Sequence, residues 1–220
     1  MTEKTIDLKQ LERKVWTSFF EDGIWDIYLG MLLAAMALGA FLRDVGVPES
    51  TQMIIYIFLI VAAILFLWAG KRFVTTPRIG RVIYGSKGKA RKTKAIFILA
   101  LSVLVGLIAF VIAALSAQGT LPQSVPTGLL LPGIWVGNML VVFSLAAYFL
   151  HFNRLYLIGV MFAIAVPLDI ILRELTHRDL TILAFGFPAV VILIMGGVVL
   201  ARFLRKYPLL ERETRDPGGQ

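Results

Sequence analysis

Four side chains inside or directly after long apolar stretches of this sequence are of types that could do chemistry. Asp169 and Arg173 are four residues apart, so on a helix they could form an ion pair or a polar stripe that gates a transporter. Asn138 is the most central strongly polar side chain, and it could line a solute path or hydrogen-bond a neighbouring helix. Asp26 stands beside Trp25 near the start of another stretch, where a carboxylate could have a structural role, face lipid headgroups or carry a proton. These four form a candidate polar site within the membrane.

A second group of residues could bind anions. Residues 70–94 hold nine basic residues and no acidic one, namely Lys71, Arg72, Arg78, Arg81, Lys87, Lys89, Arg91, Lys92 and Lys94. Each basic residue near an anionic leaflet contributes about 1 kcal/mol, so together they could bind anionic phospholipids. The same charge could instead serve only to orient the chain in the membrane. Nucleic acid is disfavoured as a partner because no recognition fold accompanies the charge.

The sequence lacks the signatures of enzymes and metal sites. It has two histidines and no cysteine, and it contains no HExxH, GxSxG or Walker-type motif. His151 and His177 would fall on opposite sides of the membrane in the topology predicted below, so they could not share a metal. We therefore expect no catalytic residue, no metal and no cofactor, and a protein that is not an enzyme.

Six apolar stretches must position these side chains. The chain is 58% apolar, with a mean hydropathy of +0.82, which exceeds what the wetted surface of a soluble domain allows. Helices are predicted at 24–42, 53–69, 95–117, 129–150, 155–172 and 181–203. At ~1.5 Å per residue, each can cross a hydrocarbon core of ~30 Å. The expected fold class is all-α, a bundle of six transmembrane helices.

The lysines and arginines predict how this bundle is oriented. Only Arg43, Arg173 and Arg178 would lie on one side, which leaves 19 of the 22 basic residues on the other. Basic residues are retained in the cytoplasm during membrane insertion, so both termini are expected there, in a plasma or inner membrane. Pro77, Gly80 and Gly85 predict that 70–94 is a cytoplasmic loop rather than one long helix.

The segments that flank the transmembrane domain, which we place at 23–207, differ in character. The apolar residues within 1–22 follow helical spacing, which predicts an amphipathic helix lying on the cytoplasmic membrane surface. Glu21-Asp22-Gly23 predicts the break that ends it. Residues 208–220 are polar and are expected to be disordered.

Small residues four positions apart predict close contacts between helices, within one chain or between copies in a homo-oligomer. Gly133 and Gly137 form such a pair, as do Gly30 and Ala34, and Ala35 and Gly39. The run Met195-Gly196-Gly197 is predicted to act in the same way. The triplet Gly-Ile-Trp occurs at 23–25 and again at 133–135. Two inverted three-helix halves are therefore an open alternative.

Two segments carry a resemblance to a known group of proteins. Residues 20–30, FEDGIWDIYLG, and residues 76–82, TPRIGRV, resemble a pattern in small uncharacterised prokaryotic membrane proteins. The resemblance implies the multi-pass architecture already predicted, and it brings no activity, ligand or catalytic residue. It also implies that the Asp22–Gly23 turn and residues 77–81 are the functional positions.

The function that these observations predict is binding rather than catalysis. Residues 70–94 and the N-terminal helix would engage anionic lipid headgroups or a membrane protein partner. The alternative is a small-solute permease or transporter subunit, acting alone or as a homodimer, with Asn138 and Asp169 near its path.

Overall fold

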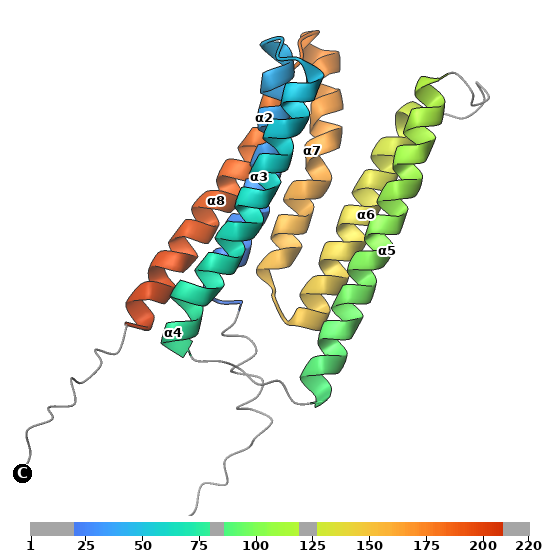
Figure 1. The fold of residues 1–220 in the computed structure, drawn as a ribbon. Helices are drawn as coiled ribbons and strands as arrows, with labels where there is room; N and C mark the ends of the chain where they lie inside the picture. Colours follow the sequence, from blue (N-terminus) through green and yellow to red (C-terminus); the bar gives the residue numbers. More distant parts are fainter. Residues whose placement is uncertain (1–19, 80–85, 119–126, 209–220) are drawn as a thin grey trace, which may run out of the picture.

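The computed structural model describes residues 20–79, 86–118 and 127–208, and in these ranges all regular structure is helical (Figure 1). The elements in chain order are α2 (Ile24–Asp44), α3 (Glu49–Ala69), the π-helical segment η1 (Gly70–Thr75), α4 (Thr76–Ile79), α5 (Ser86–Ala117), α6 (Thr127–Leu150), α7 (Arg154–Thr176) and α8 (Thr181–Lys206). The predicted all-α class is confirmed, and each of the six predicted ranges lies inside an observed helix. Residues 1–19, the predicted surface helix, and 209–220, most of the predicted disordered tail, lie outside the described part.

Five of the described helices are long and apolar enough to cross a bilayer, which is the architecture of a multi-pass membrane protein. These spans are Ile24–Asp44, Glu49–Ile79, Leu130–Leu150, Arg154–Thr176 and Thr181–Lys206. In α5 the apolar run found within the described residues is Ile96–Ala109, which is shorter than a full span.

The prediction that 70–94 is a loop is wrong for most of its length. The helix that begins at Glu49 continues through η1 and α4 to Ile79, and α5 already begins at Ser86. Pro77 does not end this helix, and the turn before it is widened into the π-helical segment η1. The Thr76 hydroxyl donates to the Lys71 carbonyl at 2.8 Å, and the Arg78 guanidinium donates to the Val74 carbonyl at 2.9 Å.

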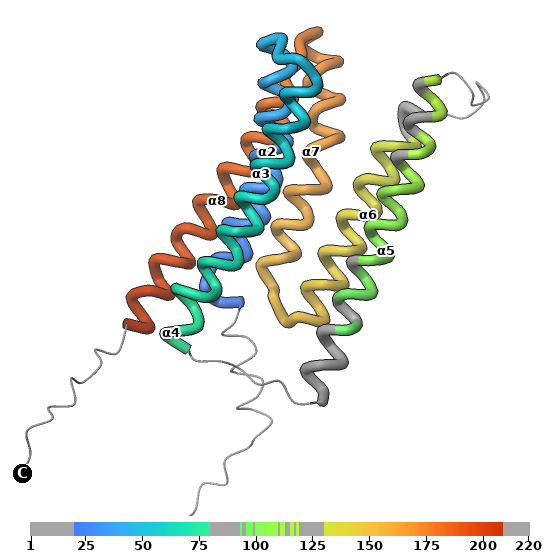
Figure 2. Tube along the Cα trace, in the orientation of Figure 1, coloured from blue at the N-terminus to red at the C-terminus, as the bar shows by residue number. Residues whose placement is uncertain are grey.

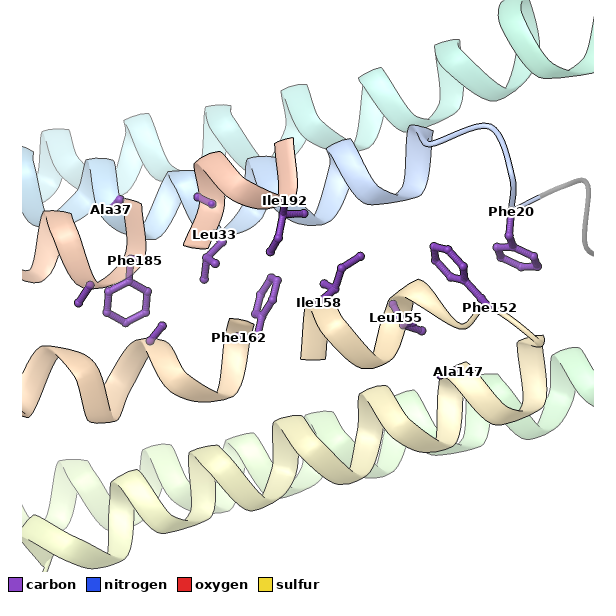
Figure 3. Close-up of a cluster of buried hydrophobic side chains, with 13 residues drawn as sticks. Phe20, Leu33, Ala37, Ala147, Phe152, Leu155, Ile158, Phe162, Phe185 and Ile192 are labelled. Atoms are coloured by element: carbon purple, nitrogen blue, oxygen red, sulfur yellow. The ribbon is translucent and has the colours of Figure 1, made fainter. Parts of the chain in front are cut away.

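The helices form a group of four with a pair packed on one side (Figure 2). In the group, α2 packs against α8 and α3, and α7 packs against α8. The pair consists of α5 and α6, and α6 packs against α7. The buried apolar core lies mainly between α2, α7 and α8, where Leu33, Ile158, Phe162 and Ile192 meet (Figure 3).

Glycines allow α2 and α8 to approach closely. Gly23 has a φ of 74°, and a Cβ there would lie 2.4 Å from the carbonyl oxygen of Gly196. A Cβ on Gly30 would lie 2.8 Å from the Cγ of Leu193. The predicted contacts at Gly30 and Gly196 are therefore made within the chain.

Gly133 and Gly137 behave differently, because a Cβ on either would meet nothing within 4 Å. Both are exposed, so the close contact predicted for them is not made within the described chain, and a contact between copies stays a prediction. The repeated triplet thus occupies two environments, since Gly23 is buried against α8 and Gly133 is not. This difference gives no support to two equivalent halves.

The contact between α2 and α8 predicts opposite effects at two neighbouring glycines. A Cβ on Gly196 would lie 2.8 Å from the backbone nitrogen of Ile27, whereas a Cβ on Gly197 would meet nothing within 4 Å. Gly196→Ala should therefore destabilise the protein by about 1–3 kcal/mol through overpacking, and Gly197→Ala should be neutral or slightly stabilising. Thermal unfolding in a neutral detergent would measure both, and equal midpoints would contradict this packing.

Candidate functional site

A buried carboxylate joins the beginning of α2 to the end of the α3 span. The side chain of Asp22, in the turn before α2, has 0% exposure, and its Oδ2 lies 2.6 Å from Nζ of Lys71. The hydroxyl of Thr75 donates to the same oxygen, and the backbone N–H of Ile24 donates to Oδ1 at 3.1 Å. Because Lys71 and Thr75 both belong to η1, the π-helical segment presents two donors to one carboxylate.

A second buried acid lies one helical turn further along α2. Asp26 has 0% exposure, and its Oδ2 lies 3.1 Å from Nε of Arg154 at the start of α7. The same guanidinium donates to the backbone carbonyl of Phe20 at 2.6 Å and stands over the ring of Phe152 at 5.2 Å. Among the described residues neither oxygen of Asp26 has a well-aligned hydrogen-bond donor. The contact with Arg154 is therefore chiefly electrostatic.

Of the roles expected for Asp26, facing lipid headgroups is wrong, because its side chain is buried and pairs with Arg154, as a structural role requires. It packs against α8 at Gly196, where a Cβ would lie 3.0 Å from the Asp26 Cβ. A glycine at this position leaves room for the carboxylate between the helices. We refer to Asp22, Asp26, Lys71, Thr75 and Arg154 as the basal cluster. It holds two acids and two bases and links the beginnings of α2 and α7 to η1.

Beside the basal cluster is an open hollow of about 480 Å³. Its lining consists of Trp25, Ile64, Leu67, Trp68, Lys71, Arg72 and Thr76. The guanidinium of Arg72 stands over the Trp68 ring at 5.6 Å and is exposed. The indole N–H of Trp25 has no hydrogen-bond partner among the described residues. The hollow thus combines apolar walls with a cation at one side.

The opposite ends of the helices carry a second charged cluster. Asp169 and Arg173 form the i, i+4 ion pair that their spacing predicts, with Oδ2 and Nε 3.1 Å apart. Arg173 also contacts Asp179 at 3.2 Å, as does Arg43 of α2. The hydroxyl of Thr181, which donates to Asp179, holds the pKa of that carboxyl below its usual value, helped by the two arginines. This cluster ties the end of α2 to the turn between α7 and α8.

Asn138 lies elsewhere, on α6, where its amide donates to the hydroxyl of Ser102 on α5 at 3.1 Å. This is the hydrogen bond between helices that was one of its two predicted roles. The four predicted polar residues therefore do not form one site. Asp26 lies at one end of the bundle, Asp169 and Arg173 lie at the other, and Asn138 links the α5–α6 pair.

The nine basic residues predicted to bind anions are not equivalent. Lys71 was predicted to bind lipid, but its side chain is only 14% exposed and is bonded to Asp22, so it is not available for that contact. Arg78 donates to the Val74 carbonyl, and its Nε is buried. Among the three of these nine residues whose side chains the structure describes, Arg72 is the exposed one. Arg81 and the side chains of Lys87, Lys89, Arg91, Lys92 and Lys94 lie outside the described part.

Most of the basal cluster was not predicted from the sequence. The resemblance pointed to the Asp22–Gly23 turn, although not to the partners of Asp22. Arg154 was counted only among the basic residues that orient the chain, and Thr75 was not predicted to have a role. Their roles depend on contacts between residues far apart in the chain, and no local spacing reveals such contacts.

Comparisons with known proteins do not assign the site. No family model, no curated protein and no solved structure matches this chain. Among the described residues no group of three or more histidine or acidic side chains is arranged to hold a metal ion. What the basal cluster can do must therefore be argued from its geometry.

The burial of Asp22 predicts a large effect of removing its partner. Lys71→Met would leave a carboxylate with 0% exposure without its counter-charge, at a cost of about 3 kcal/mol. Arg205→Met removes an exposed charge from α8 and should change the unfolding midpoint little. Thermal unfolding in neutral detergent would compare the two variants. Adding Asp22→Asn to Lys71→Met should cost less than the two single changes together, and additive costs would contradict direct coupling.

Proposed function

We propose that this protein is an integral membrane protein with six transmembrane helices, that it is not an enzyme, and that its basic end binds anionic phospholipid headgroups. In this proposal α5 provides the sixth span, and both termini lie in the cytoplasm of a plasma or inner membrane. The five long apolar helices and the apolar run in α5 support the proposal. So does the sorting of basic residues, which are retained in the cytoplasm during insertion.

One observation carries this proposal: the basic ends of separate helices meet at one end of the bundle. Lys71 at the end of the α3 span contacts Asp22, and Lys206 at the end of α8 lies 4.0 Å from Glu21 in the same turn. Arg72, Arg202 and Arg205 are exposed there, and among the described residues no carboxylate lies within 4.0 Å of them.

The opposite end of the bundle has a different balance of charge. Two of its three arginines, Arg43 and Arg173, contact Asp179, and Arg173 also contacts Asp169, whereas Arg178 is exposed and has no carboxylate within 4.0 Å among the described residues. Cations that are already paired gain less from a lipid phosphate than exposed and unpaired ones do. This difference favours the basic end as the site of binding. Asn138 and Asp169 are bonded within the chain in separate regions, so no observation favours the permease alternative.

The six-span arrangement predicts the sidedness of three positions. The chain contains no cysteine, so Lys87→Cys, Ser124→Cys and Gly218→Cys each introduce a single thiol. In membrane vesicles of known orientation, an impermeant maleimide should label positions 87 and 218 from the same side and position 124 from the other. Labelling of 87 and 124 from one side would mean that α5 does not cross, and would contradict the arrangement.

Binding of anionic lipid predicts a stabilisation that depends on headgroup and salt. Adding phosphatidylglycerol to the full-length protein in neutral detergent should increase its free energy of unfolding, by about 2 kcal/mol at concentrations well above the dissociation constant. The unfolding midpoint should rise accordingly. Phosphatidylcholine should have a smaller effect, and high salt should reduce the difference because it screens exposed charges. Equal effects of the two lipids at low salt would contradict the proposal.

A further inference from the structure

We infer that the hollow between α2 and α3 binds one anionic phospholipid molecule, with its phosphate at Arg72 and the upper part of an acyl chain along Ile64 and Leu67. This inference rests on the proposed function and deepens it. Binding at the basic end is then localised in this hollow and is not spread over all the exposed cations of that end.

The shape and lining of the hollow suit an amphipathic ligand. Its volume of about 480 Å³ is within the range of pockets that bind small molecules. Ile64 and Leu67 of α3 lie on its apolar side, about two turns and one turn before Lys71 and Arg72. Along one helix the lining thus changes from hydrocarbon to cation, as a phospholipid changes from acyl chain to phosphate.

Arg72, rather than Lys71, supplies the charge for this phosphate. The ammonium of Lys71 is 2.6 Å from the buried carboxylate of Asp22, which balances it. The guanidinium of Arg72 is exposed and is held over the Trp68 ring at 5.6 Å, so its position is partly set before a ligand arrives. A planar guanidinium can donate two parallel hydrogen bonds to a phosphate.

The two tryptophans that line the hollow favour a lipid over a free anion. Tryptophan is enriched where hydrocarbon meets headgroups, and Trp25 and Trp68 stand at the level where the apolar part of α3 ends. A soluble phosphate would leave Ile64 and Leu67 uncovered.

The test is native mass spectrometry of the full-length protein released from nanodiscs that contain phosphatidylglycerol and phosphatidylcholine. Arg72→Gln should weaken retention of phosphatidylglycerol about fivefold, the ratio that ~1 kcal/mol represents at 25 °C. Arg205→Gln removes an exposed charge from the same end but outside the hollow, and should change retention less than about twofold. Because Arg72 is exposed, its variant should unfold at the wild-type temperature in lipid-free detergent.

A second measurement locates the lipid directly. Phosphatidylglycerol with a photoreactive diazirine in its acyl chain should label the peptide that spans residues 64–76 in the wild type, and should label it less in Arg72→Gln. Labelling confined to other peptides would overturn the site.

The outcomes separate this site from the broader proposal. If the wild type prefers phosphatidylglycerol but both variants lose it equally, the hollow is not the site and binding at the basic end stands. If the wild type shows no preference between the two lipids, the proposed function fails and the site fails with it. If glycerol phosphate competes as well as phosphatidylglycerol, the hollow takes a free phosphate and the assignment of a lipid is wrong.

Discussion

The burial of two carboxylates at one end of the bundle constrains much of the remaining structure. A charged group removed from solvent is costly unless an opposite charge lies close to it, so Asp22 and Asp26 require Lys71 and Arg154. Those partners come from η1 and from the start of α7, and the pairs therefore determine how three helix ends meet. The widened turn in η1 and the glycine at 196 are the local features that make room for these contacts.

The two ends of the bundle use the same types of residue with different results. At the basal cluster the acids are fully buried, and Lys71 is used inside the protein while Arg72 remains exposed beside it. At the other end Asp179 is 35% exposed, and it forms ion pairs with Arg43 and Arg173 and accepts a hydrogen bond from Thr181. At the first end a hollow with apolar walls lies beside the exposed guanidinium of Arg72.

Neighbouring residues on one helix therefore have different roles. A count of basic residues treats Lys71 and Arg72 alike, yet one closes a buried ion pair and the other stands over an exposed indole. The glycines show the same division, since Gly196 lies against α2 and Gly197 meets nothing. In each case the rotation of the helix between consecutive residues turns one neighbour toward the core and the other away from it.

The sequence alone determined the all-α class and the apolar central part of each helix, because long apolar runs without breaks can satisfy their backbone only as helices in lipid. It also predicted the local Asp169–Arg173 pair, whose members lie one turn apart. Tertiary structure decided the rest. The partners of Asp22 and Asp26 are distant in the chain, and the helix continues through 70–79 past Pro77, where local propensity predicts a break. Local propensity describes neighbours along the chain, whereas the pairing of buried charges depends on which helices pack together.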